Sequence, residues 1–296
     1  MLLKEFVESS RRDLGRIYPE REAGAITGIL CTELLGVQPF AHLVRPEMAL
    51  TKAVEAKVLD ALERLCSNEP VQYVLGFTSF CGERFNVNRS VLIPRPETEL
   101  MCGEAVETAM MLYRERSAYG KDAKRIRILD MCTGSGCMAW IFAKRIPAAE
   151  VVAVDVSGEA LTVAASQPVT VKRAPSFVKA DIFDVEAVDA LAAGGFDLMV
   201  SNPPYIMESE KGAMRRNVLD YEPGLALFVP DDNPLVFYDA LADICKKHIH
   251  AGGTGFFEIN ERMGGPVADL FKSKGLLNVT VMADQFGRNR YLKCVR

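Results

Sequence analysis

Residues 129–137, Leu-Asp-Met-Cys-Thr-Gly-Ser-Gly-Cys, decide the fold of this 296-residue chain. They continue a predicted apolar strand, 126–131, and place a glycine loop between it and a predicted helix. Gly134 and Gly136 allow unusual φ values and a close approach of the backbone to a ligand. In open α/β sheets, ligands bind beyond the carboxyl ends of the strands. The stretch therefore predicts a strand, a ligand-binding loop and a helix in succession.

Strands and helices alternate from residue 125 onward, which predicts an α/β fold. We expect a Rossmann-like, doubly wound sheet of seven strands that are mostly parallel. Only residues 283–289 join the last two strands, so these should be antiparallel neighbours. One helix should begin with Asn233 as its N-cap and Pro234 at its first position. The predicted strands are 126–131, 151–156, 177–180, 196–201, 254–259, 279–282 and 290–295.

The part of the chain before this sheet has a mainly helical pattern instead of alternating strands and helices. Apolar residues recur at helical spacing in three stretches up to residue 68, which predicts a small all-helical module. Residues 77–87 are rich in aromatic and β-prone residues and predict a β-hairpin with a tight turn at Gly82-Glu83. Pro96 then opens a helix. We therefore expect a helical, substrate-recognising domain over residues 1–75, a β-hairpin linker over 76–95 and the α/β domain over 96–296.

Composition narrows the class of protein. The net charge of −4 and a pI near 5.6 argue against a protein that mainly grips phosphate backbones, so we expect no direct nucleic-acid partner. The eight cysteines show no disulfide framework, which is typical of reduced thiols. Residues 1–15 do not resemble a signal peptide, and no apolar run is long enough to span a bilayer. We expect a cytoplasmic protein without a membrane partner.

Acidic residues follow two further strands at the edge where the glycine loop lies. Asp155 ends the second strand, 19 residues after Gly136, and suits hydrogen bonds to both hydroxyls of a ribose. The loop alone fits NAD as well as S-adenosylmethionine, because Ala139 is tolerated at the third position of the GxGxxG pattern. Asp181 and Ile182, after the third strand, could hold an adenine ring. Asp181 could equally be the N-cap of the next helix.

The most informative tetrapeptide is Asn202-Pro203-Pro204-Tyr205, directly after the fourth strand. A rigid structural turn is the alternative interpretation. Prolines fix φ and remove N–H donors, which leaves carbonyl oxygens as acceptors. A planar NH2 group is a weak nucleophile, and two acceptors directed at its hydrogens would orient it and stabilise the charge that develops. The Asn202 side chain and the Pro203 carbonyl can supply these acceptors, and Tyr205 can pack on the planar face.

This chemistry requires positioning rather than a strong base, because a sulfonium methyl group is already reactive. None of the three histidines lies in these loops. His248 and His250 lack a carboxylate partner at metal-ligand spacing, so we expect no metal site. Together, the glycine loop, Asp155 and the tetrapeptide favour a methyltransferase over a dehydrogenase.

At this point the sequence resembles the bacterial release factor glutamine methyltransferases of the HemK/PrmC type. The stretch Ile-Pro-Arg-Pro-Glu-Thr-Glu at 93–99 is the most specific match, whereas Asn-Pro-Pro-Tyr is shared with adenine-N6 methyltransferases. The helical module also resembles the N-terminal domain of the family. The matching stretches are 69–73 with Gly76, 92–100, 133–137, 200–206, 221–223 with 225–227, and 287–290.

The resemblance implies a class I methyltransferase domain that uses S-adenosyl-L-methionine. It also implies N5-methylation of the glutamine in the Gly-Gly-Gln (GGQ) loop of class I peptide chain release factors, with Asn202 to Tyr205 holding the target amide. Two residues depart from the family: Cys132 replaces a glycine and should not easily adopt positive φ, and Ile182 replaces a tryptophan found in some members. The implied cofactor contacts are Cys132, Thr133, Gly134, Ser135, Gly136, Asp155, Asp181, Ile182 and Asn202.

Several roles and alternatives stay open. Arg95, Glu97 and Glu99 could bind the substrate loop, or they could simply begin a helix. Glu258, near the end of a buried strand, could face the pocket. Arg288 and Arg290 could contact substrate or be ordinary surface charges. The alternative functions are an adenine-N6 methyltransferase acting on nucleic acid, a ribosomal-protein glutamine methyltransferase, and a non-enzymatic sensor of S-adenosylmethionine.

Overall fold

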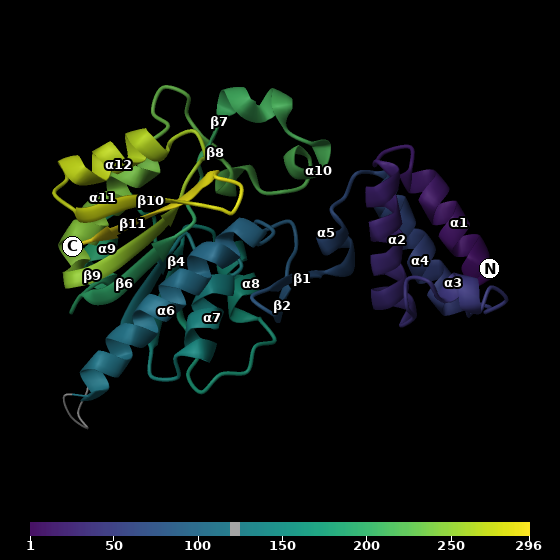
Figure 1. Cartoon of the computed structure of the whole chain (residues 1–296), viewed down its shortest axis with the longest axis horizontal. Helices are drawn as coiled ribbons and strands as arrows, with labels where there is room; N and C mark the ends of the chain where they lie inside the picture. Colours follow the sequence, from purple (N-terminus) through teal and green to yellow (C-terminus); the bar gives the residue numbers. More distant parts are fainter. Residues whose placement is uncertain (119–124) are drawn as a thin grey trace. The chain divides into compact units, whose positions relative to one another are not determined.

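The computed structural model describes residues 1–118 and 125–296 (Figure 1). Contacts divide the chain into two compact units. The first comprises Met1–Gly76 and Arg215–Tyr221, and the second comprises Phe77–Met214 and Glu222–Arg296. Within the described residues, no helix combines the length and the apolar character that crossing a membrane requires.

The first unit is all-helical, as the apolar spacing predicted. Leu3, Phe6 and Leu14 are fully buried in its core. The segment 215–221 belongs to this unit because Arg215 pairs with Glu22 at 3.0 Å and the Tyr221 hydroxyl donates to the Ser67 carbonyl at 2.6 Å. Its helices are α1 (Leu3–Leu14), α2 (Glu20–Leu35), α3 (Ala41–Val44), α4 (Lys52–Cys66), α5 (Val71–Leu75) and α10 (Arg216–Leu219).

The second unit begins with the predicted hairpin, formed by β1 (Phe77–Phe80) and β2 (Glu83–Asn86). The turn lies at Cys81-Gly82, one residue earlier than predicted. These two residues have positive φ values of 50° and 81°. Two such residues are what a type I′ turn requires. Phe80 and Phe85 bury their rings in the core of this unit.

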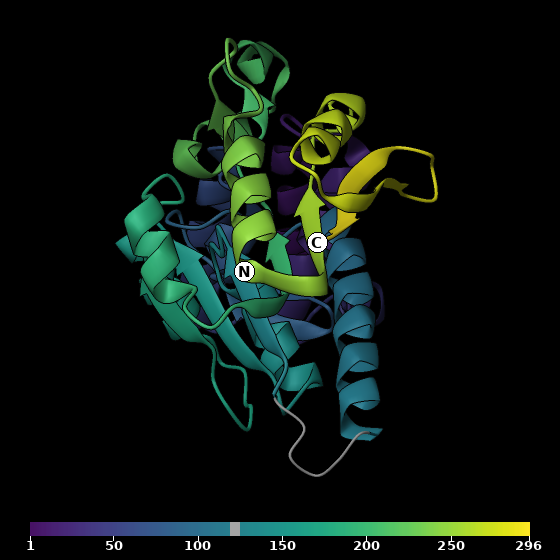
Figure 2. The ribbon, with the colours of Figure 1, turned by 90° about the vertical axis from the view of Figure 1, so that its left-hand side faces the viewer.

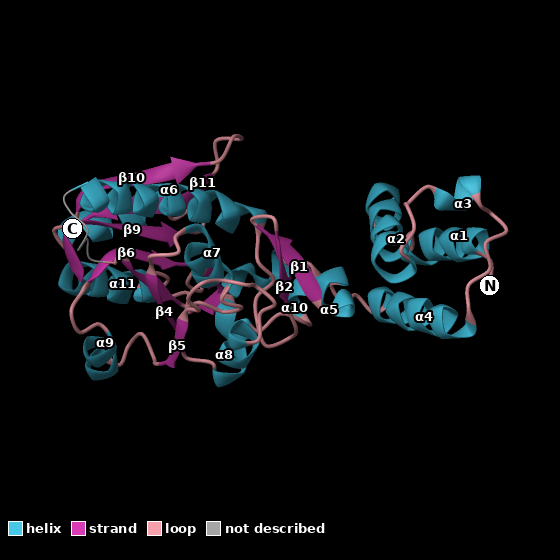
Figure 3. Ribbon diagram, turned by 90° about the horizontal axis from the view of Figure 1, so that it is seen from below, coloured by secondary structure: helices cyan, strands magenta, loops and turns pink. Residues whose placement is uncertain are grey.

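A seven-stranded sheet forms the centre of the second unit (Figure 3). Its order is β10-β11-β9-β6-β3-β4-β5, and β11 is antiparallel to both of its neighbours while the other pairs are parallel. The predicted fold class is confirmed, as is the antiparallel pairing of the last two strands. The strands are β3 (Arg127–Met131), β4 (Glu150–Asp155), β5 (Ser176–Lys179), β6 (Phe196–Ser201), β9 (Ile249–Glu258), β10 (Leu277–Ala283) and β11 (Asn289–Val295), beside a small pair β7 (Ile206–Met207) and β8 (Phe228–Val229).

Helices cover both faces of this sheet (Figures 1 and 2). One apolar core lies between the sheet and α6 with α7, and the other lies between the sheet and α9, α11 and α12. The predicted N-cap at Asn233 is wrong: α11 begins at Val236, and Asn233 instead accepts the Val236 amide through its carbonyl at 3.3 Å. The helices are α6 (Pro96–Ala118), α7 (Cys137–Arg145), α8 (Gly158–Ala165), α9 (Val185–Leu191), α11 (Val236–His248) and α12 (Gly264–Ser273), with short 3-10 turns at Glu208–Ala213 and Gly224–Ala226.

The strand order locates the ligand cleft. From β3 the chain moves outward to β4 and β5, then returns to β6 on the other side of β3 and continues to β9. Neighbouring strands whose connections leave in opposite directions open a crevice at their carboxyl ends. The loops after β3 and β6 are the glycine loop and the Asn202–Tyr205 loop, so both lie at this crevice.

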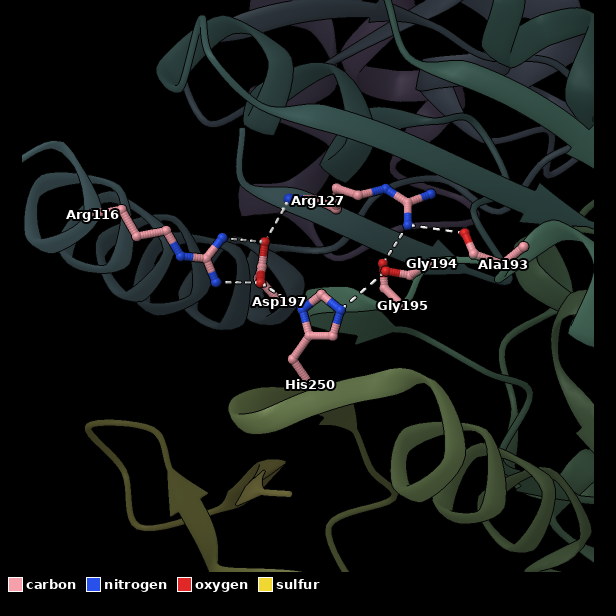
Figure 4. A network of polar contacts seen from close by, with 7 residues as sticks. All are labelled: Arg116, Arg127, Ala193, Gly194, Gly195, Asp197 and His250. Atoms are coloured by element: carbon pink, nitrogen blue, oxygen red, sulfur yellow. Dashed lines mark hydrogen bonds and ion pairs between the residues drawn. The ribbon is translucent and has the colours of Figure 1, made fainter. Parts of the chain in front are cut away.

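The opposite, amino edge of the sheet is held by a charged network around Asp197, at the start of β6 (Figure 4). Arg116 at the end of α6 donates to both oxygens of this carboxylate. The Arg127 amide of β3 and His250 of β9 also bind Asp197, at 2.8 and 3.0 Å. Asp197 is almost fully buried, and desolvation by itself would raise its pKa. Its hydrogen bonds and ion pairs, above all those from Arg116, outweigh desolvation and hold the pKa below the usual range. The network fixes three strands and one helix far from the crevice.

Candidate active site

A cavity of about 210 Å³ lies at the carboxyl ends of β3, β4, β5 and β6. The glycine loop and the loop after β6 both line it, although 66 residues separate Gly136 from Asn202 in the chain. The lining does not include Gly136, Pro203, Tyr205, Arg95, Glu97 or Glu99, all of which the structure describes. The predicted residues that do line it are Cys132, Thr133, Gly134, Ser135, Asp155, Asp181, Ile182, Asn202 and Pro204.

The glycine loop is left-handed at three positions. Cys132 has a φ of 59°, so the expectation that it avoids positive φ is wrong. Such a conformation costs a non-glycine residue roughly 1–2 kcal/mol. It is held by hydrogen bonds on either side, from the Thr133 amide to the Val154 carbonyl and from the Ser201 hydroxyl to the Met131 carbonyl, at 3.0 and 2.8 Å.

The two glycines of the loop serve different purposes. Gly134 has a φ of 54°, and a Cβ there would meet no atom within 4 Å, so its surface is open to the cavity. Gly136 has a φ of 76°, and a Cβ there would lie 2.9 Å from the Ala164 Cβ and 3.1 Å from the Phe177 ring. Gly136 therefore permits close packing of α7 against α8 and β5, whereas Gly134 permits approach by a ligand.

Asp130 braces the loop from beneath, within β3. It is fully buried, and its Oδ2 accepts a hydrogen bond of 2.7 Å from the Thr133 hydroxyl, while Oδ1 makes no hydrogen bond to a described residue. Burial raises the pKa of Asp130 to about 7. An acid inside an otherwise apolar strand was the visible signal for this residue, and our sequence analysis gave it no role.

Asp155, at the end of β4, is held by backbone donors. Its Oδ2 accepts from the Gly134 amide at 2.8 Å and its Oδ1 from the Ser157 amide at 2.9 Å. A carboxylate offers about four acceptor positions, so each oxygen retains capacity for a ribose hydroxyl. Burial raises the pKa of Asp155, and the backbone amides of Ser157 and Gly134 oppose that rise.

Beyond Asp155 the cavity has an apolar wall. Ile182 is buried, and the rings of Phe183 and Phe237 meet beside it with centroids 5.1 Å apart. Asp181 does not cap α9, so that alternative is wrong: Asp184 is the N-cap and accepts the Ala187 amide at 3.0 Å. No pattern in the sequence marked Phe183 or Phe237 as site residues.

The loop after β6 is tied to a buried carboxylate. The Asn202 Nδ2 donates to the Thr98 hydroxyl oxygen at 3.2 Å, and the Thr98 hydroxyl donates to the Glu258 Oε2 at 2.6 Å. The Tyr205 hydroxyl donates to the other Glu258 oxygen at 3.0 Å. Burial raises the pKa of Glu258, and burial together with the nearby carboxylate raises that of Tyr205, which therefore keeps its proton as a donor.

Comparisons with known proteins cover both units. Residues 9–76 match the PrmC N-terminal domain, and residues 117–219 match the methyltransferase small domain. A release factor glutamine methyltransferase of Bacteroides thetaiotaomicron is 37% identical, over 97% of each chain. That of Flavobacterium psychrophilum is 32% identical, over 99% of each. The chain belongs to the release factor glutamine methyltransferase family.

A solved structure agrees at the level of the fold. The catalytic domain of hMettl16, in complex with the MAT2A 3′UTR hairpin 6, has a TM-score of 0.52 and covers 84% of this chain, which in turn covers 83% of that domain. At 11% identity, this likeness shows the methyltransferase fold alone.

In this family member, Arg95 and Glu97 at the start of α6 are paired within the second unit. Arg95 donates to the buried Glu222 at 2.6 Å, and Glu222 also accepts the Ile93 amide at 3.2 Å. Arg290 pairs with Asp284 at 2.7 Å and lies 3.5 Å from Glu97. These pairs shape the backbone next to Thr98, and our sequence analysis had not anticipated Glu222.

Proposed function

We propose that this protein transfers a methyl group from S-adenosyl-L-methionine to the side-chain amide N5 of the glutamine in the GGQ motif of class I peptide chain release factors. The names of the relatives support this substrate. The observation that carries the proposal is that one cavity is lined both by Gly134 of the glycine loop and by Asn202 and Pro204 of the loop after β6. A cofactor and a target amide can therefore meet there.

The residues of the cavity fit the cofactor. Gly134 leaves open space for close approach, Asp155 has acceptor capacity for the ribose, and Ile182 offers an apolar face to adenine beside Asp181. Thr133 and Ser135 complete the wall, and Gly136 contributes by letting α7 pack closely. When bound, S-adenosyl-L-methionine supplies an electrophilic methyl group on a sulfonium.

The protein's own contribution on the target side is orientation. The Asn202 side-chain oxygen and the Pro203 carbonyl would accept the two hydrogens of the glutamine NH2, which directs its nitrogen at the methyl group. Pro204 lines the cavity together with Asn202, and Tyr205 holds the loop through Glu258. The helical domain would contact the release factor, and Arg95, Glu97 and Glu99 of the second unit would bind its GGQ loop.

A methylation assay tests the proposal. The protein is incubated with labelled S-adenosyl-L-methionine and a class I release factor, in wild-type form and with the GGQ glutamine replaced by alanine. Label should enter only the wild-type factor. Label on the replaced factor, or on DNA but not on the factor, would reject the assignment in favour of another target. In the enzyme, Asn202→Ala should remove about 2–4 kcal/mol of transition-state stabilisation, measured as kcat/KM.

A further inference from the structure

The side chain of Asn202 can be held in two ways that differ by exchange of its amide oxygen and nitrogen. Only one of them places an acceptor before a target NH2 group, because the nitrogen end of the amide carries hydrogens. Under the proposed function, on which this inference rests, activity depends on which end faces the cavity.

The hydrogen-bonded chain from Glu258 settles that choice. The hydroxyls of Thr98 and Tyr205 donate to different oxygens of Glu258, which is the arrangement an ionised carboxylate requires, because it can only accept. Thr98 has a single hydroxyl hydrogen, which is then used, and its oxygen can only accept from Asn202. The Asn202 nitrogen therefore turns to Thr98. Among the described residues, none donates a hydrogen bond to the Asn202 Oδ1, which is left for a ligand.

The burial of the hydrogen bonds from Glu258 through Thr98 to Asn202 indicates that they serve more than the stability of the fold. Glu258 is 3% exposed and Thr98 is 3% exposed, at the end of β9 and in the first turn of α6. Among the described residues, no basic side chain lies at hydrogen-bond distance from Glu258. Burying such a carboxylate is costly, and an apolar pair of similar size would pack at lower cost. Thr98 also lines the cavity, so the chain reaches the site directly.

We infer that Glu258 and Thr98 are positioning residues: the Glu258 carboxylate fixes the direction of the Thr98 hydroxyl, which holds Asn202 with its amide oxygen free to accept a hydrogen of the target carboxamide. In this role both residues act through Asn202 rather than on the reacting atoms. Their effect on methyl transfer passes through Asn202, and this gives the inference a test that a merely structural role would not satisfy.

The test is a double-mutant cycle on methylation of a release factor. Thr98→Val, which removes the hydroxyl at nearly constant volume, should lower kcat on the order of 10- to 100-fold, with little change in the Kd for S-adenosyl-L-methionine. Thr98→Ser should restore most of the turnover. In an Asn202→Ala background, Thr98→Val and Glu258→Gln should cause no further loss, because the group they position is gone. Equal losses in both backgrounds, or wild-type kcat in Thr98→Val, would overturn the inference.

A second readout separates this inference from the proposed function. The two side-chain NH2 protons of any asparagine are inequivalent, and in the wild-type protein the hydrogen bond to Thr98 should separate the two 15N–1H signals of Asn202 further by shifting one of them downfield. Thr98→Val should bring these signals closer together, with or without any substrate. If the release factor is not methylated but this change occurs, the proposed substrate fails and the positioning role stands. Unchanged signals would overturn the positioning role itself.

Discussion

Replacement of Asp130 by Asn should flatten the dependence of stability on pH. Folded Asp130 keeps its proton up to about pH 7, whereas an aspartate in the unfolded chain releases it near 3.8. Between these values the folded state binds more protons, so a rise in pH favours unfolding. Each pH unit in this window corresponds to about 1.4 kcal/mol. From pH 5 to pH 8, Asp130 alone should therefore lower the free energy of unfolding of its unit by roughly 2–3 kcal/mol.

The assay is urea unfolding at pH 5 and pH 8. Trp140, the single tryptophan, is buried in α7 next to the glycine loop and reports on the second unit. Asp130→Asn keeps an oxygen that can accept the hydrogen bond from Thr133. Between pH 5 and pH 8, the free energy of unfolding should fall by roughly 2–3 kcal/mol less in this variant than in the wild type. Asp197→Asn is the control, because the lowered pKa of Asp197 means that this carboxyl group titrates below pH 5. If the free energy of unfolding of Asp130→Asn fell between pH 5 and pH 8 as much as that of the wild type, the reasoning would be refuted.

Four further substitutions test the fold and the cofactor site. Gly136→Ala should cost about 2–4 kcal/mol of stability, since its Cβ would collide with neighbouring atoms at positive φ, whereas Gly134→Ala should cost only about 1–2 kcal/mol; thermal unfolding compares them. Asp155→Ala should weaken S-adenosyl-L-methionine binding roughly 10- to 100-fold by calorimetry, through loss of about 1.5–3 kcal/mol of charge-assisted hydrogen bonding. Arg116→Met should lower the free energy of unfolding at pH 7 by about 2–4 kcal/mol, because the buried Asp197 loses its arginine partner, and this loss should shrink as pH falls through the lowered pKa of Asp197.

Sequence reasoning located the strands and their loops because their signals are local. Gly134 follows the apolar run that ends at Met131 by three residues, and Asn202 directly follows the run that ends at Ser201, so the chemistry-bearing residues adjoin the elements that carry them. Parallel strands then bring their carboxyl ends to one edge without any further information. This is why most of the predicted cofactor residues line one cavity.

Local signals failed where distant contacts decide the outcome. Asn233 and Pro234 look like a helix start, but the turn before α11 uses the Asn233 carbonyl and delays the helix to Val236. Cys132 adopts positive φ because hydrogen bonds from the flanking strands outweigh its intrinsic preference. Thr98 and Glu258 are 160 residues apart, and no spacing pattern could pair them.

Two buried carboxylates now hold the two loops of the site, and they differ in one respect. Among the described residues, Asp130 has a hydrogen-bond donor on Oδ2 only, so protonation can place a hydrogen on Oδ1 and leave the bond from Thr133 intact. Glu258 has a hydroxyl donor on each oxygen, so protonation must displace or reverse one of them. The loop after β3 can therefore tolerate loss of its buried charge, whereas the loop after β6 cannot, because there the charge determines which end of Asn202 faces the cavity.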